Sequence, residues 1–62
     1  MKKYYVTYFE RDEVPIEIYS MDIEVPLEDE EKIDAEYFIS RMHPPPYQHL
    51  GRYCQIISWS QY

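Results

Sequence analysis

Hydrophobic and polar positions follow a helical period in one stretch of the chain, Ile33–Met42. Its apolar side chains recur at i, i+3, i+4 and i+7 and therefore share one helix face: Ala35, Phe38, Ile39 and Met42. Asp34 precedes this face and can cap the helix by accepting hydrogen bonds from backbone N–H groups of the first turn. The pattern predicts a short amphipathic helix that packs on a sheet.

The start of this helix is defined by two further signals. With Asp34 as the N-cap, Ile33 and Phe38 hold the two positions of a hydrophobic staple. A helix that began at Leu27 would turn Ile33 away from the Phe38 face and would place like charges side by side. We therefore expect residues 27–32 to form a loop or a frayed turn.

Prolines predict the end of the helix and the conformation of the next segment. Pro44 disfavours a helical conformation at the residue before it, so the helix should end near Met42. The prolines at 44–46 predict a short polyproline II segment, and Gly51 can supply a positive φ for the return of the chain. With Tyr47 these prolines fit the pattern Pro-Pro-x-Tyr, and in these four residues the chain resembles the ligands of WW domains.

Three other segments are rich in residues that strands favour. Residues 3–10 carry apolar or aromatic side chains on both faces, which predicts a central strand. Residues 14–25 alternate between apolar and polar positions but change phase after Ile18, which predicts a β-bulge or a break near Tyr19. Residues 53–59 predict the last strand.

The order of these elements, β-β-α-β, predicts an α+β fold in which one helix packs on a face of a three-stranded antiparallel sheet. A chain of 62 residues forms a single domain, residues 1–62. In the last strand we expect Ile57 and Trp59 to share one face and Cys54 and Ile56 the other. The expected core residues are Val6, Ile16, Ile23, Phe38, Ile39, Met42, Ile56 and Ile57.

The single cysteine excludes an internal disulfide, and we expect a reducing compartment, the cytoplasm. Two lysines stand near the N-terminus, but the uninterrupted apolar region of a signal peptide does not come after them. No apolar run has the length of a membrane span, so we expect no membrane contact. A small core with open strand edges also predicts self-association, most simply as a two-fold homodimer.

Charge is strongly segregated along the chain. All twelve acidic residues lie between Glu10 and Glu36, where only Arg11 and Lys32 oppose them, giving this segment a net charge of −10. The two flanks together carry +4, so the whole chain has a net charge of −6. Such a segment attracts a basic surface on another molecule.

We therefore expect a small acidic, non-catalytic protein–protein interaction module. Its general character is that of phage- or mobile-element-type inhibitors or adaptors, which here would act on a nucleic-acid-handling protein with a basic surface. The expected partner-binding residues are Glu13, Glu17, Asp22, Glu24, Glu28, Asp29, Glu30, Glu31, Tyr19 and Tyr47.

An alternative function rests on the aromatic content. Aromatic side chains on a sheet face can stack single-stranded nucleic acid, and six residues qualify: Tyr4, Tyr5, Tyr8, Phe9, Tyr53 and Trp59. The net charge of −6 opposes this function, because phosphate binding relies on Lys and Arg. We do not expect nucleic acid to be the partner.

A second alternative is a zinc-stabilised mini-domain that uses His43, His49 and Cys54. Structural zinc sites usually contain paired ligands such as C-x2-C, and none is present, so we expect surface histidines, a buried cysteine and no metal or cofactor. The single glycine excludes a glycine-rich phosphate loop, and no serine stands in a nucleophile elbow. The sequence predicts no catalytic residues and no enzyme.

Overall fold

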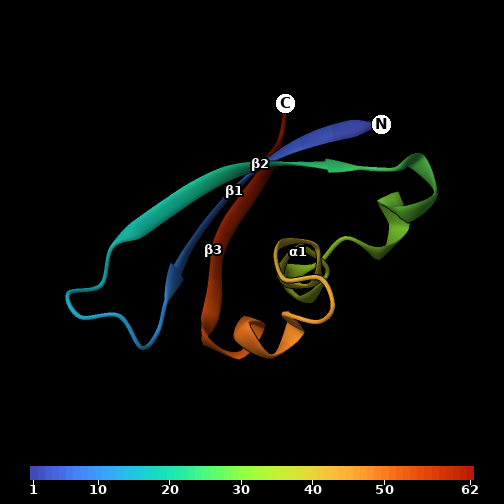
Figure 1. The fold of residues 1–62 in the computed structure, drawn as a ribbon. Helices are drawn as coiled ribbons and strands as arrows, with labels where there is room; N and C mark the ends of the chain where they lie inside the picture. Colours follow the sequence, from blue (N-terminus) through green and yellow to red (C-terminus); the bar gives the residue numbers. More distant parts are fainter.

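The computed structural model describes all residues from Met1 to Tyr62. Its elements in chain order are β1 (Lys2–Glu10), β2 (Ile18–Val25), the 3-10 helix η1 (Leu27–Lys32), α1 (Ala35–Met42), the 3-10 helix η2 (Gln48–Tyr53) and β3 (Cys54–Gln61). The strands form one antiparallel sheet in the order β2-β1-β3, and α1 lies on one face of it (Figure 1). The predicted α+β fold and the central position of the first strand are confirmed.

Local signals define α1 as expected. Asp34 is the N-cap, and its Oδ1 accepts a hydrogen bond from the Tyr37 backbone N–H at 2.7 Å. The helix ends at Met42, and the N–H of His43 donates to the carbonyl of Ile39 at 3.0 Å. Residues 27–32 stay outside α1, as predicted, and form the separate 3-10 helix η1.

The core lies between α1 and the facing side of the sheet. Six hydrophobic residues are buried in it: Val6, Ile23, Val25, Phe38, Cys54 and Ile56. Phe38 is fully buried, and its ring centroid lies 5.6 Å from that of Tyr4 and 5.4 Å from that of Trp59. Ile39 and Met42 are half-buried and pack against this cluster, so six of the eight expected core residues contribute to it.

The start of the second strand was predicted too early. β2 begins at Ile18, and its pairing with β1 runs without a shift, so the irregularity predicted near Tyr19 is a break before the strand and not a β-bulge. The change of phase arises because residues 14–17 belong to the connection, where apolar side chains face solvent. The expected core residue Ile16 is accordingly 57% exposed.

A β-bulge occurs instead in β3, which explains the other error in the expected core. Thr7 pairs with Ser58 and Tyr8 with Ile56, so Ile57 is the extra residue. The bulge reverses the alternation and turns Trp59 toward α1 on the same face as Ile56. The predicted pairing of Ile57 with Trp59 on one face is therefore wrong, and Ile57 is 50% exposed.

The segment between α1 and β3 also differs from the prediction. The prolines form a turn rather than a polyproline II segment, with the Tyr47 N–H donating to the Pro44 carbonyl at 2.8 Å. Gly51 does not have a positive φ. It is buried in η2, and a Cβ there would stand 2.6 Å from Ile39 Cγ2, so glycine permits the close approach of η2 to α1.

Candidate functional site

The acidic residues follow one another along the outer edge of the sheet and into η1. We define the acidic strip as Glu13, Glu17, Asp22, Glu24, Glu28, Asp29, Glu30 and Glu31. It runs along the β1–β2 connection, continues along β2, which is an outer strand of the sheet, and ends in η1 (Figure 1). Neighbours in sequence thus remain neighbours along this edge. The Tyr19 side chain that holds Glu13 and Glu17 comes from the α1 face of the sheet, whereas Asp22 and Glu24 belong to the opposite face.

Tyr19 organises the carboxylates at the start of the strip. Its hydroxyl lies 2.7 and 2.8 Å from the two carboxylate oxygens of Glu13 and 3.4 Å from Glu17 Oε2. The Tyr19 ring packs beside the ring of Tyr8, with centroids 5.7 Å apart. The hydrogen bond to Glu13 and partial desolvation raise the pKa of Tyr19 to about 12. Tyr19 therefore holds the connection in place as well as lying beside the strip.

In the middle of the strip, Asp22 and Glu24 project from the face of the sheet opposite α1, because they alternate with the buried Ile23. Tyr62 donates from its hydroxyl to Asp22 Oδ1 at 2.5 Å. This hydrogen bond raises the pKa of Tyr62. Glu24 stands opposite Lys3 in the register of β1 and β2.

In η1 some carboxylates contact other side chains of the protein, and others have no such contact. Asp29 accepts a hydrogen bond from the Tyr37 hydroxyl at 2.8 Å and lies 3.7 Å from Lys32 Nζ. Desolvation and this hydrogen bond raise the pKa of Tyr37. Glu30 Oε1 lies 3.3 Å from Lys2 Nζ. Asp29 and Glu30 are thus half-buried and serve the fold.

Three carboxylates remain available to another molecule: Glu24, Glu28 and Glu31. Their side chains are exposed and take part in no ion pair or tyrosine hydrogen bond. The sequence could indicate the whole strip but not this division, because the partners Tyr37, Tyr62 and Lys2 come from other elements. Tyr47, also expected at the site, is exposed in the turn before η2 and lies outside the strip.

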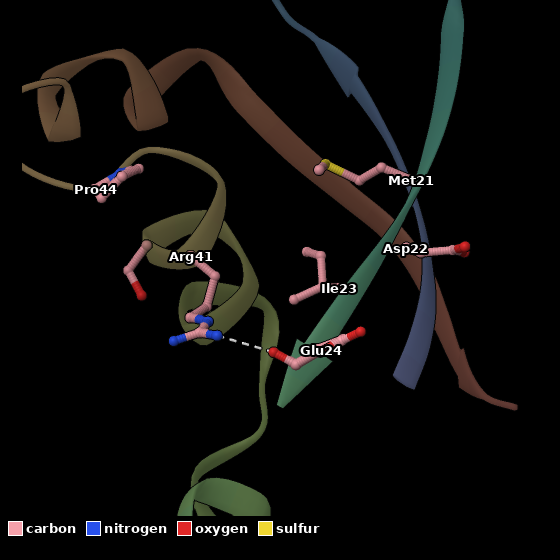
Figure 2. A pocket seen from close by; sticks show the side chains of 7 residues that line it. Met21, Asp22, Ile23, Glu24, Arg41 and Pro44 are labelled. Carbon is pink, nitrogen blue, oxygen red and sulfur yellow. Dashed lines mark hydrogen bonds between the residues drawn. The ribbon is translucent and has the colours of Figure 1, made fainter. Parts of the chain in front are cut away.

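A cleft of about 500 Å³ separates β2 from the C-terminal half of α1 (Figure 2). The side chains of Met21 and Ile23 point from β2 toward α1, whereas that of Asp22 points away (Figure 2). Arg41 Nη2 donates to the backbone carbonyl of Glu24 at 2.9 Å across the cleft. Arg41 thereby engages a backbone carbonyl of β2, an outer strand of the sheet, that would otherwise be free to pair with another strand.

The six aromatic residues of the alternative function do not form one platform. Tyr4, Tyr8 and Trp59 belong to the sheet face that meets α1, whereas Tyr5 and Phe9 belong to the opposite face. Tyr53 is the last residue of η2. The arrangement presents no continuous aromatic surface along which successive bases could stack.

Of the three candidate metal ligands, only His43 and Cys54 lie close together. His49 is exposed in η2, whereas His43 lies near Cys54 together with Glu10, which the sequence did not single out. Cys54 is buried, as predicted, and burial together with the charge of Glu10 raises the pKa of its thiol to about 11. A nucleophilic cysteine requires a thiolate, so the raised pKa opposes a nucleophilic role.

Comparison of the chain with protein-family models, with curated proteins and with solved structures finds no match. Within the molecule, no helix combines the length and the apolar character that crossing a membrane requires.

Proposed function

We propose that this protein is a non-catalytic protein–protein interaction module whose acidic strip binds a basic surface on another protein. The observation that carries this proposal is the position of the strip on an outer strand and the adjoining η1, with Glu24, Glu28 and Glu31 exposed and unpaired. The engaged members, Asp29 and Glu30, hold η1 against α1 and β1 through Tyr37 and Lys2. With η1 fixed in this way, its backbone can present Glu28 and Glu31 to a partner without first becoming ordered.

The proposed partner is a nucleic-acid-handling protein, and the proposed action is that of a phage- or mobile-element-type inhibitor or adaptor. The acidic strip belongs to the segment 10–36, which has a net charge of −10. It is therefore complementary to a groove lined with Lys and Arg. Such a groove normally neutralises phosphates. Occupying it with carboxylates would compete with nucleic acid for the same basic side chains.

Two further features belong to this proposal. We place the protein in the cytoplasm, because its one cysteine is buried and unpaired, as is usual in a reducing compartment. We also propose that it forms a homodimer, because only six hydrophobic residues are buried in its core and β3 leaves one sheet edge unpaired.

The test compares two variants with the same change of net charge. In the first, Glu28→Gln and Glu31→Gln neutralise the open carboxylates of η1. In the second, the matched control, Gln48→Lys and Gln55→Lys add two positive charges at exposed positions outside the strip. Each protein is immobilised and used to capture basic, DNA-binding proteins, and the association rate with the captured protein is then measured at two salt concentrations.

The strip variant should associate more slowly than the control, and duplex DNA should compete with the wild-type protein for the captured partner. The rate should also fall with salt, because the screening length shrinks from about 10 Å at 0.1 M to about 3 Å at 1 M. Equal rates for both variants, or capture that DNA leaves undisturbed, would rule out a strip that imitates nucleic acid.

A further inference from the structure

Three potential metal ligands from distant parts of the chain meet at one corner of the fold. Glu10 ends β1, His43 caps the C-terminus of α1, and Cys54 begins β3. One ligand atom from each of these side chains lies within 4.8 Å of the other two. We propose that Glu10, His43 and Cys54 bind a zinc ion.

The fold positions each of the three residues. Glu10 and Cys54 are direct cross-strand partners, so their side chains lie on the same face of the sheet. His43 is fixed by the hydrogen bond of its N–H to the Ile39 carbonyl. Its ring also packs near η2, since a Cβ on Gly51 would stand 3.8 Å from His43 Cδ2. The approach of η2 to α1 therefore holds the imidazole close to the first residue of β3.

The environment of His43 gives an independent indication of a ligand. Its Nε2 atom is shielded from solvent and has no hydrogen-bond partner. A shielded polar atom without a partner is destabilising, and most such atoms in folded proteins are paired. Cys54 beside it has an exposed fraction of only 5%. A cation bound among the three side chains would contact the imidazole, the sulfur and the carboxylate at the same time.

The ligand set selects the metal. Binding of Zn²⁺ displaces the proton of the Cys54 thiol, since the metal-bound form is the thiolate. A thiolate, an imidazole and a carboxylate are all ligands of Zn²⁺, whereas Ca²⁺ and Mg²⁺ prefer oxygen ligands throughout. Zinc bonds of about 2.0–2.3 Å place tetrahedral ligand atoms about 3.5 Å apart. The present separations, all within 4.8 Å, would shorten by up to about 1.3 Å on binding. Three protein ligands leave the fourth position for water.

A metal at this corner would connect β1, α1 and β3, which are otherwise held by a core of six buried hydrophobic residues. Small domains commonly gain stability from such a link. The inference differs from the zinc site that the sequence suggested, because His49 takes no part and Glu10 replaces it. None of the three ligands belongs to the acidic strip, although Glu13 at the start of the strip donates its backbone N–H to the Glu10 carbonyl at 3.3 Å.

The test uses the reduced, chelator-treated full-length protein, titrated with Co²⁺ as a spectroscopic substitute for Zn²⁺. Binding should produce a thiolate-to-cobalt charge-transfer band, which Zn²⁺ should then abolish by displacement. Zinc should also raise the melting temperature. The variants Glu10→Gln, His43→Gln and Cys54→Ser each remove one ligand, and His49→Gln is the matched control for a histidine outside the site.

His49→Gln should keep the charge-transfer band and the wild-type affinity for cobalt. The loss of a ligand should weaken cobalt binding by at least about tenfold. Even residues that only hydrogen-bond to a metal ligand change metal affinity by about 10- to 100-fold. If Cys54→Ser fails to fold, the two variants of the half-buried residues Glu10 and His43 still decide the question. Absence of the band in the wild-type protein, or equal losses in His43→Gln and His49→Gln, would overturn the proposal.

Discussion

Gly51 and Ile39 approach each other so closely that a methyl group on Gly51 would stand 2.6 Å from Ile39 Cγ2. The φ angle of Gly51 is not positive, so an alanine would fit the backbone and would clash only through its side chain. Ile39 lies in α1, where a β-branched side chain has little rotational freedom. The contact therefore explains why η2 contains glycine at this position.

The first prediction is that Gly51→Ala lowers the free energy of unfolding by about 1–3 kcal/mol, the usual cost of overpacking. Urea denaturation of the purified protein measures it. The same substitution in an Ile39→Ala background should cost much less, because the clashing methyl is absent. An equal cost in both backgrounds would show that the glycine is required for a reason other than this contact.

The second prediction compares neighbouring isoleucines in β3. Ile56 is 9% exposed and belongs to the core, whereas Ile57 is the bulge residue and is 50% exposed. Ile56→Ala should cost about 2–5 kcal/mol, and Ile57→Ala should change stability by only about 0.5 kcal/mol. Equal losses in thermal or urea unfolding would mean that the alternation continues through residue 57 without a bulge.

The third prediction concerns alkaline pH. The pKa of Tyr19 is about 12 in the folded protein and about 10 in an unfolded chain, chiefly because of its hydrogen bond to Glu13. The folded protein thus keeps a proton that the unfolded chain loses. This contribution to stability is complete below about pH 10 and is lost as the pH rises toward about 12.

The measurement is the stability difference between the wild-type protein and Tyr19→Phe in urea, monitored from about pH 8 to about pH 11. The difference should shrink across the upper part of this range. Tyr47→Phe, in the exposed turn before η2, serves as the control and should show no such trend. A constant difference for Tyr19→Phe would mean that its hydroxyl does not bond to Glu13 in solution.

The fourth prediction is self-association. Like charges repel at a net charge of −6, so dimerisation should strengthen as salt increases. This dependence is opposite to that expected for binding a basic partner. Sedimentation equilibrium at several salt concentrations tests it, and a monomer at high micromolar concentration in high salt would refute it.

Local patterns were sufficient for α1 and insufficient for strand ends. Asp34, the apolar face and Pro44 all act within a few residues, and they defined α1 correctly. The start of β2 depends on where its pairing with β1 begins. An apolar residue such as Ile16 does not indicate whether it lies inside or outside the paired region. The bulge at Ile57 depends on the register between β1 and β3, and this also lies outside any local pattern.

The same distinction applies to the sites. The acidic strip could be predicted because its members are close together in the sequence and remain so along β2 and η1. The hydrogen bond from Tyr62 to Asp22 could not be predicted, because Tyr62 is the last residue of the chain and lies 40 residues from Asp22 in the sequence. Glu10 and Cys54 meet only through strand pairing, so their proximity becomes visible once the register is known.

The hydrogen bond from Arg41 to the Glu24 carbonyl bears on how this protein can assemble. A sheet that accepts new strands at both edges can grow without limit, and fibres form in this way. Here one edge is obstructed by a guanidinium and bordered by carboxylates, which leaves β3 as the edge open to another chain. In the proposed homodimer, two molecules that joined through β3 would use up each other's free edge, and assembly would end at the pair.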